Sequence, residues 1–261
     1  MVGGASALQF CSPSPSYSPT TLDIYAPVER SEDVVEHLTV IEHYWQKSKR
    51  FPEDETEHDE IPSEDDDLDV IGPSYGVASS TTFRRGKVEV VLHQCLSGCP
   101  TLPIPQRPCT VEMVFLTENA ACVLYPGHVE QRRGLLNPKR FPYRTPVDDD
   151  HPAKEHVEDL ERSGYDIADC EIDWRGPRPR GKPCAVKQNP ACASAVRHVG
   201  DAACLVASFA TVGGRTGVPA LPLYVTEWAP VWWRGGMMCV PPCAAAMTHF
   251  RAALWVQRFP G

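Results

Sequence analysis

Prolines are spread along most of the chain and limit how much helix it can form. The sequence has 26 prolines among 261 residues, about twice the usual share of roughly 5%. An interior proline removes a backbone hydrogen bond from a helix and clashes with the preceding turn. Because short runs rich in β-branched residues lie between the prolines, the sequence favours an all-β chain with long loops.

Several short segments have the alternation or the β-branched content of strands. The ambiguous segment 34–45 fits either a strand or a helix, and its β-branched residues favour the strand. Residues 117–120 are expected to form a hairpin link, and short helices are expected near 155–163 and 244–257. Residues 223–233 are aromatic-rich and broken by Pro230. The predicted strands cover residues 22–28, 87–92, 111–116, 121–125, 167–174 and 203–212.

The chain shows no internal repeat, and its organisation is predicted from composition. Residues 1–20 are rich in Ser and Pro, so we expect a disordered N-terminal segment. Residues 21–235 are expected to form one binding domain, with an extended acidic loop at 51–76. Residues 236–261 are expected to form a divergent C-terminal tail.

Acidic residues are concentrated in one short stretch. Residues 53–69 hold eleven Asp or Glu and no Lys or Arg. Removing these eleven charges from the net charge of −9 leaves about +2 for the rest of the chain. Such a stretch projects into solvent, because like charges at this density repel one another. It serves solubility alone, or it steers a basic partner.

The cysteines point to an oxidising compartment. Eleven cysteines are scattered along the chain, and this pattern favours disulfides over the CxxxC zinc alternative at Cys95/Cys99 and Cys239/Cys243. We therefore expect a secreted protein, although the start, MVGGASALQFC, lacks the basic and long apolar regions of a signal peptide. The longest apolar run, 202–212, is too short to span a membrane.

Motifs of catalysis and nucleic-acid binding are missing from the sequence. It contains no GxGxxG, Walker A, HExxH or GxSxG pattern. The DDDH stretch at 148–151 fits a solvated loop better than a metal site. The basic stretch 175–182 is short and broken by prolines, which argues against nucleic acid as a partner. We expect a protein that is not an enzyme and needs no cofactor or metal.

Three stretches in order resemble the secreted chemokine-binding proteins of poxviruses, the type II viral CC chemokine inhibitors. The first is Cys11, a polar spacer and then LDIY at 22–25. The second is EIPSEDDDLDVIGPSYG at 60–76, followed by VEVVLHQCLSGCP at 88–100. The third is SGYDIADCEIDW at 163–174, and Cys204 with the run after it fits more loosely. The resemblance covers roughly residues 11–212; the missing signal peptide and the helical look of the C-terminal end depart from the family.

This resemblance implies a two-sheet β-sandwich that binds host chemokines on one exposed sheet and blocks receptor engagement. The acidic loop would meet basic chemokine residues. Tyr75 matches the family's aromatic position after the loop, and Lys87, or less closely Arg84 or Arg85, stands near its basic position. Glu171 matches an acidic strand position. The implied chemokine-binding residues are Glu60, Glu64, Asp65, Asp66, Asp67, Asp69, Tyr75, Lys87 and Glu171.

Two alternatives remain open. EWAPVWW at 227–233 is reminiscent of the WSxWS-like element in a related parapoxvirus inhibitor of granulocyte-macrophage colony-stimulating factor and interleukin-2. Trp228 and Trp232 would then bind the cytokine, unless they are ordinary core aromatics. The second alternative is an intracellular acidic interaction protein whose thiols are reduced.

Overall fold

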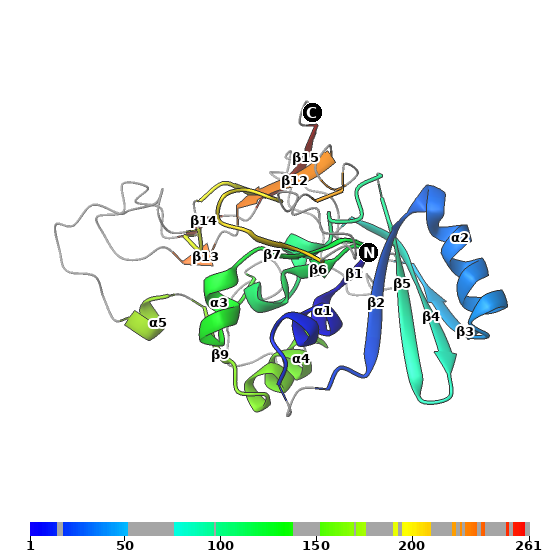
Figure 1. Cartoon of the computed structure of the whole chain (residues 1–261). Coiled ribbons are helices and arrows are strands. Elements are labelled where there is room, and N and C mark those ends of the chain that lie inside the picture. Colours follow the sequence, from blue (N-terminus) through cyan, green and yellow to red (C-terminus); the bar gives the residue numbers. More distant parts are fainter. Residues whose placement is uncertain are drawn as a thin grey trace, which may run out of the picture.

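The computed structural model shows a β-rich chain built around one large mixed sheet, which confirms the β-rich prediction. Its eight strands follow the order β11-β7-β6-β1-β2-β5-β4-β3 (Figure 1). The described residues are 1–14, 18–51, 76–96, 98–137, 152–169, 171–175, 190–192, 195–209, 221–222, 225, 228–233, 236–237, 249–250 and 253–258.

Strands from distant parts of the chain interleave in this sheet. The N-terminal strands β1 and β2 lie between β6 and β5, and β3 pairs with β4 at the edge. β2 and β5 run parallel, whereas the other neighbouring pairs are antiparallel. The strands are β1 (Val2–Gly3), β2 (Thr21–Pro27), β3 (Trp45–Arg50), β4 (Val77–Arg85), β5 (Val88–Cys95), β6 (Val114–Leu116), β7 (Ala120–Val123) and β11 (Leu205–Ser208).

Smaller sheets complete the β structure. β10 (Arg197–His198), β12 (Trp228–Trp233) and β15 (Ala253–Arg258) form a three-stranded antiparallel sheet. β8 (Arg133–Leu135) pairs in parallel with β9 (Asp166–Ala168), and β13 (Gly236–Met237) pairs with β14 (His249–Phe250). Five of the predicted strand segments and the aromatic-rich run 223–233 overlap an observed strand, and 117–120 links the antiparallel pair β6–β7. The sixth predicted strand, 167–174, is a strand only through Ala168 and is followed by helix α5 (Ile172–Arg175).

Residues 2–11 form a strand and a helix, whereas the composition predicts disorder over 1–20. β1 is followed by helix α1 (Gly4–Cys11), whose Ala7 and Leu8 are fully buried. Gly4 has a φ of +64° and a Cβ there would collide with the Arg107 guanidinium, so glycine is required at this bend. Side chains of α1 pack with Val157 and Leu160 of α4 (Pro152–Arg162), the helix expected near 155–163.

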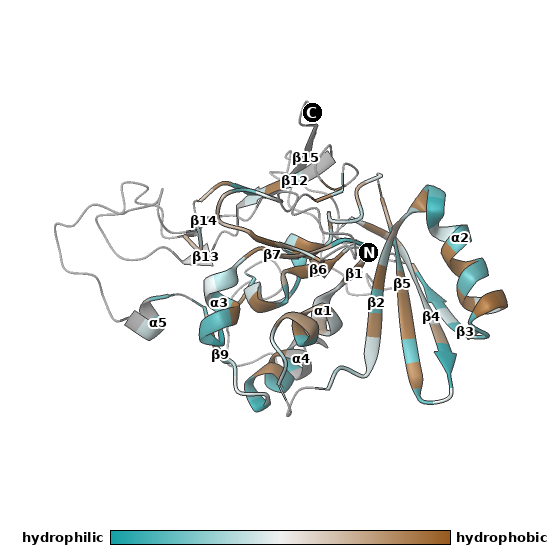
Figure 2. Cartoon of the chain, in the orientation of Figure 1, coloured by the Kyte–Doolittle hydropathy of each residue, from teal (hydrophilic) through white to brown (hydrophobic). Residues whose placement is uncertain are grey.

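The ambiguous segment 34–45 is helical up to Ile41, which corrects the preference for a strand. After a short turn, η1 (Val28–Arg30), helix α2 (Ser31–Glu36) continues as a π-helical turn, η2 (His37–Ile41). Its Leu38 packs against Phe83, Val90 and Leu92 of the sheet, and Figure 2 shows hydrophobic stretches on both α2 and the strands beside it. In a helix, one side of this segment is buried against the strands. The free energy gained by this burial outweighs the preference of its β-branched residues for a strand.

The prediction of a helix at 244–257 is also wrong, because the described residues there form the strands β14 and β15. β15 pairs along its whole length with β12, so the predicted boundary at residue 235 falls between paired strands. Partner strands supply hydrogen bonds that local helical propensity does not foresee.

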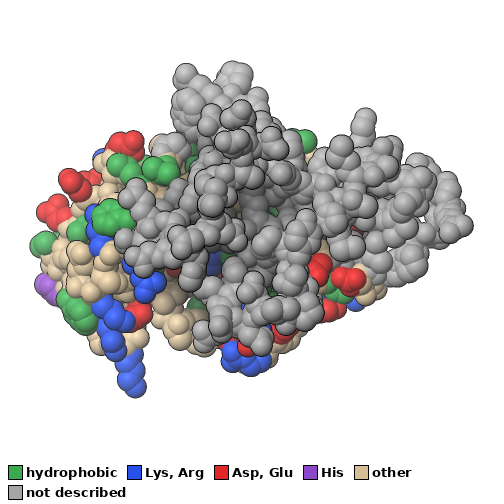
Figure 3. All heavy atoms as spheres, turned by 180° about the vertical axis from the view of Figure 1, so that it is seen from behind, with side chains coloured by type: hydrophobic (Ala, Val, Ile, Leu, Met, Phe, Trp, Pro, Cys, Tyr) green, Lys and Arg blue, Asp and Glu red, His purple; other side chains and the backbone are tan. Residues whose placement is uncertain are grey.

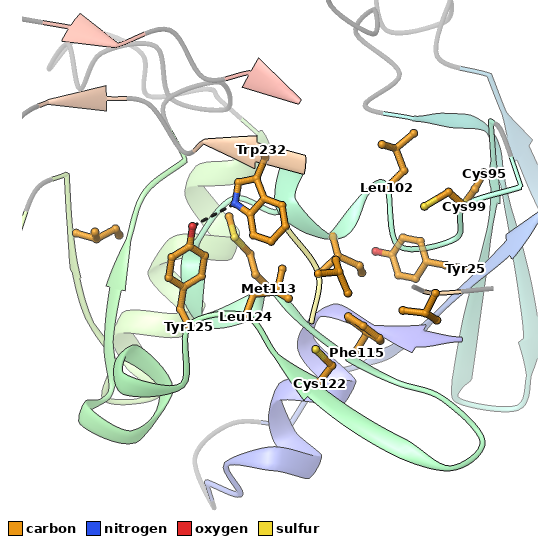
Figure 4. Close-up of a cluster of buried hydrophobic side chains, with 14 of the residues drawn as sticks. Tyr25, Cys95, Cys99, Leu102, Met113, Phe115, Cys122, Leu124, Tyr125 and Trp232 are labelled. Carbon is orange, nitrogen blue, oxygen red and sulfur yellow. Dashed lines mark hydrogen bonds between the residues drawn. The ribbon is translucent and has the colours of Figure 1, made fainter. Parts of the chain in front are cut away.

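The largest core cluster in the described part of the chain joins the eight-stranded sheet to Trp232 of β12. Tyr125, Met113, Leu124, Phe115 and Cys122 come from β6, β7 and the residues around them, and Trp232 of β12 packs onto this group (Figure 4). The Trp232 indole Nε1 donates a hydrogen bond to the Tyr125 hydroxyl at 3.2 Å. Further short elements that frame the cores are η4 (Ile104–Gln106), η5 (Thr110–Glu112) and α3 (Pro126–Gln131).

Candidate functional site

Strand β3 forms one edge of the eight-stranded sheet. All six of its residues are exposed, and among the described strands β4 alone pairs with it. Its register against β4 shifts between Gln46 and Ser48, as at a β-bulge. An edge strand presents unpaired backbone N–H and C=O groups, which can pair with an added chain.

Basic side chains gather around this edge. We name the group Lys47, Lys49, Arg50, Arg84, Arg85 and Lys87 the basic edge. Figure 3 shows Lys and Arg side chains on the side of the molecule that carries β3, β4 and β5. Lys47 Nζ lies 2.9 Å from Glu89 Oε1, and Arg85 Nη1 lies 3.0 Å from Glu42 Oε2. These two carboxylates pair with only part of the six positive charges of the basic edge.

Exposed apolar side chains lie among these charges. Trp45 is 53% exposed, Phe51 49% and Val88 52%. Lys49 Nζ stands 5.1 Å from the Phe51 ring centroid, and the Arg85 guanidinium stands 4.6 Å from that of Tyr44. Aromatic groups amid a charged rim are typical anchors of protein interfaces.

The acidic stretch is attached to the sheet at this same edge. β3 ends at Arg50 and β4 begins at Val77, and Arg50 pairs in register with Ser80. Both attachment points of the stretch therefore belong to neighbouring, paired strands. The predicted residues Glu60, Glu64, Asp65, Asp66, Asp67, Asp69 and Tyr75 lie outside the described residues.

The two remaining residues that the resemblance predicts to bind a chemokine lie apart. Lys87 is exposed in the two-residue turn between β4 and β5, next to Gly86 with its φ of +61°, and it belongs to the basic edge. Glu171 precedes α5 and is not in a strand; its side chain is 12% exposed and lies 3.9 Å from His128 Nε2. The structure thus places Lys87 at the edge and Glu171 in a half-buried contact.

Of the two tryptophans that the cytokine alternative would use, Trp228 and Trp232, the structure describes the side chain of Trp232 only. Trp232 is 1% exposed and belongs to the core between the sheets, which fits an ordinary core aromatic. The side chain of Trp228 lies outside the described part of the chain, although its backbone begins β12. Trp232 is therefore not presented to a partner on this surface.

A second polar group, on the face of the sheet opposite α2, links three strands. Ser80 Oγ lies 2.9 Å from His93 Nδ1, and His93 Nε2 lies 3.3 Å from Asp23 Oδ1. The residue types match a nucleophile, base and acid relay. However, Asp23 Oδ2 also lies 3.5 Å from Nη2 of the buried Arg107. The Asp23 carboxylate therefore forms an ion pair with Arg107 as well as contacting His93. We interpret the group as a structural tie between β2, β5 and β4.

The described part of the chain holds a third polar cluster, centred on Arg197. Its Nε and Nη2 contact the Asp201 carboxylate at 2.5 and 2.9 Å, and Nη2 donates to the Leu124 carbonyl at 2.9 Å. The side chain is 3% exposed. Hydrogen bonds from Arg197 help to lower the pKa of Asp201 against the opposing effect of burial.

Five cysteines differ from the expectation of disulfides. Cys11, Cys95, Cys109, Cys122 and Cys204 are free thiols. Burial raises the pKa of both Cys95 and Cys109 to about 12, so these two thiols stay protonated. Cys170, Cys184, Cys239 and Cys243 lie outside the described residues.

Sequence reasoning named Arg84, Arg85 and Lys87 but missed the β3 part of the basic edge, and it missed the Arg197 cluster. The signal for β3 was available, because WQKSKRF at 45–51 places three basic residues between two aromatic ones. Arg197 and Asp201 carry no distinctive motif, since their meeting with Leu124 depends on contacts distant in sequence. Within the described ranges, no three His, Cys, Asp or Glu side chains are grouped to hold a metal ion, and no helix is long and apolar enough to cross a membrane.

Comparison of the chain with protein-family models, curated proteins and solved structures finds no match.

Proposed function

We propose that this protein is a non-enzymatic, secreted binding protein that captures a small basic signalling protein of the chemokine class at the β3 edge. The observation that carries this proposal is the attachment of the acidic stretch to both β3 and β4. A ligand drawn by the carboxylates would arrive beside an open strand edge with exposed Trp45 and Phe51. Charge would supply on-rate and orientation, and the apolar anchors would supply affinity.

The basic edge adds a condition on how the ligand binds. A uniformly basic surface would be repelled by Lys49, Arg50 and their neighbours. We therefore propose that the basic face of the ligand meets the acidic stretch, while a neutral or acidic segment of it lies along β3. The two main sheets would form the layers of a sandwich, which is supported by the packing of Trp232 onto Tyr125.

Surface plasmon resonance against a panel of chemokines tests this proposal. Granulocyte-macrophage colony-stimulating factor and interleukin-2 are included to test the cytokine alternative. Failure of every chemokine to bind with a dissociation constant below about 1 µM would contradict the chemokine proposal. Binding of one of the two cytokines alone would favour the alternative.

A matched pair of variants tests the role of the acidic stretch. The test variant is Glu64→Gln, Asp65→Asn, Asp66→Asn and Asp67→Asn. The control removes the same charge from exposed residues of η1 and α2, with Glu29→Gln, Glu32→Gln, Asp33→Asn and Glu36→Gln. We expect the test variant alone to lower the association rate about tenfold or more at low salt. Equal losses in both variants would show that net charge acts without the stretch.

The second alternative, an intracellular acidic interaction protein, is favoured by one observation. Five cysteines are free thiols, and reduced thiols are usual inside cells. Mass spectrometry of each cysteine in protein from its native source separates the two candidates. Disulfides at Cys11, Cys95 or Cys109 would support secretion, whereas free thiols at all three would support the intracellular candidate.

A further inference from the structure

Two thiols meet at the edge of the large sheet opposite β3. Cys122 lies in β7 and pairs in register with Val206 of β11, and Cys204 lies two residues before Val206. Cys204 comes directly before β11 (Leu205–Ser208), so it lies diagonally across from Cys122. Both side chains belong to one hydrophobic cluster, with Cys122 in its buried part and Cys204 packed against it. Cys204 is only half-buried, because β11 is the outermost described strand here.

The Arg197 guanidinium approaches one sulfur of this pair. Arg197 Nη2 donates to Cys204 Sγ at 3.5 Å. The guanidinium is fixed by Asp201 and the Leu124 carbonyl, and it lies over the Tyr125 and Trp232 rings. A buried cation held in this way stabilises negative charge on a neighbouring sulfur.

The groups facing Cys204 pull its pKa in both directions. The hydrogen bond from Cys122 and the Arg197 charge lower it, while burial and the Asp201 charge raise it, and the balance is a lowered pKa. The His198 carbonyl oxygen, 3.8 Å from the sulfur, accepts a hydrogen bond from the protonated form. The pKa of Cys122 is raised, chiefly by the Cys204 sulfur and then by burial, so Cys204 is the more readily deprotonated of the two thiols. Cys11, also half-buried, has a pKa raised by burial and provides an internal reference.

We propose that Cys204 and Cys122 form a reactive dithiol site, in which Cys204 attacks a hydroperoxide and Cys122 resolves the product. The Cys204 thiolate displaces one oxygen of the peroxide bond, which gives a sulfenic acid and, after protonation, an alcohol or water. The Cys122 sulfur then attacks the sulfenic sulfur, releases water and closes a disulfide. Overall, two thiols lose two electrons and two protons to the hydroperoxide. The product would link β7 to β11 covalently.

Site-resolved oxidation of the full chain tests this site. The protein is reduced, freed of reductant and mixed with equimolar hydrogen peroxide, and each cysteine is followed by mass spectrometry. We expect the Cys204 thiol to disappear at least about tenfold faster than that of Cys11, with a Cys122–Cys204 disulfide as product. Equal rates at Cys204 and Cys11, or a Cys122–Cys204 disulfide that thiol reductants cannot open, would overturn the proposal.

Alkylation by iodoacetamide as a function of pH provides a test without any variant. The rate at Cys204 should level off at a lower pH than the rate at Cys11, because the thiolate reacts. Coincident profiles would argue against a stabilised thiolate. In Cys122→Ser, we expect the sulfenic acid at Cys204 to accumulate and be trapped by dimedone. Cys11→Ser is the matched control and should leave oxidation of Cys204 unchanged.

Discussion

Arg197 is a buried charge whose desolvation is offset by several contacts at once. The carboxylate of Asp201, the carbonyl of Leu124 and two aromatic rings surround it. Removing one partner of such a pair leaves an uncompensated charge, which costs about 3 to 5 kcal/mol. One residue thus links β10 to the end of β7 and to the turn before β11.

Asp201 should make the stability of the protein depend on acid pH. Its pKa is lowered in the folded state from an ordinary value of 3.8, so its contribution is complete above that value. The contribution is lost as the pH falls through the folded pKa. Urea unfolding from about pH 5 to about pH 2 should show this loss. In Asp201→Asn, stability should be lower at pH 5 and should fall less over the same range; an unchanged slope would contradict the assignment.

Trp232 should matter for stability and not for partner binding. Trp232→Ala removes a fully buried ring and should lower the free energy of unfolding by about 3 to 5 kcal/mol. Trp232→Phe keeps most of the packing and loses the hydrogen bond to Tyr125, so a smaller loss of about 1 kcal/mol is expected. Denaturant titration measures both. A loss of cytokine binding by a well-folded Trp232→Phe protein would instead support the cytokine alternative.

Helix α2 shows how an element can be misread from its residues alone. A helix over this run aligns Val34, Leu38 and Ile41, whereas a strand aligns Leu38, Val40 and Tyr44, so spacing alone does not decide between them. The decision comes from the sheet, because Phe83, Val90 and Leu92 offer an apolar face that a helix can cover. The same reason explains β15, whose strand form depends on β12. By contrast, β2, β5 and the β6–β7 hairpin were predictable, since alternation and turn residues lie within each segment.

Two substitutions on the helical segment separate its buried and exposed faces. Leu38 is 5% exposed, and Leu38→Ala should cost about 2 to 4 kcal/mol because a cavity opens above the sheet. Val40 is 57% exposed, and Val40→Ala should change stability by no more than about 0.5 kcal/mol. Chemical denaturation of the two proteins compares them directly. Similar losses would show that the helix does not pack through Leu38.

At the scale of the whole molecule, charge is separated along one edge of the sheet. The acidic stretch holds eleven carboxylates, whereas the net charge of the whole chain is −9. The strands to which this stretch is attached, β3 and β4, carry most of the basic edge. The sequence predicted the first half of this arrangement from composition. The second half depended on β3 pairing beside β4, which brings Lys47 and Arg84 to the same carboxylate, that of Glu89, from positions far apart in the sequence.

The sheet should tolerate large changes in the acidic stretch. β3 and β4 are held by their own ladder, and β4 pairs with β5 over nearly its whole length. Replacing residues 53–69 by a Gly/Ser segment of equal length should therefore change the unfolding free energy by less than about 1 kcal/mol. Doubling the length of that segment should cost only about 0.6 kcal/mol more. Thermal unfolding checks both, and loss of the folded state would show that the stretch is part of the core.

The interleaved strand order also bears on how the chain could be divided. A single cut near residue 60 would leave β1, β2 and β3 on one fragment and β4 to β7 on the other. β1 and β2 sit between β6 and β5, so neither fragment retains a continuous sheet by itself. Such a nicked protein should hold together without its covalent link, and the two pieces, expressed apart, should regain structure only on mixing.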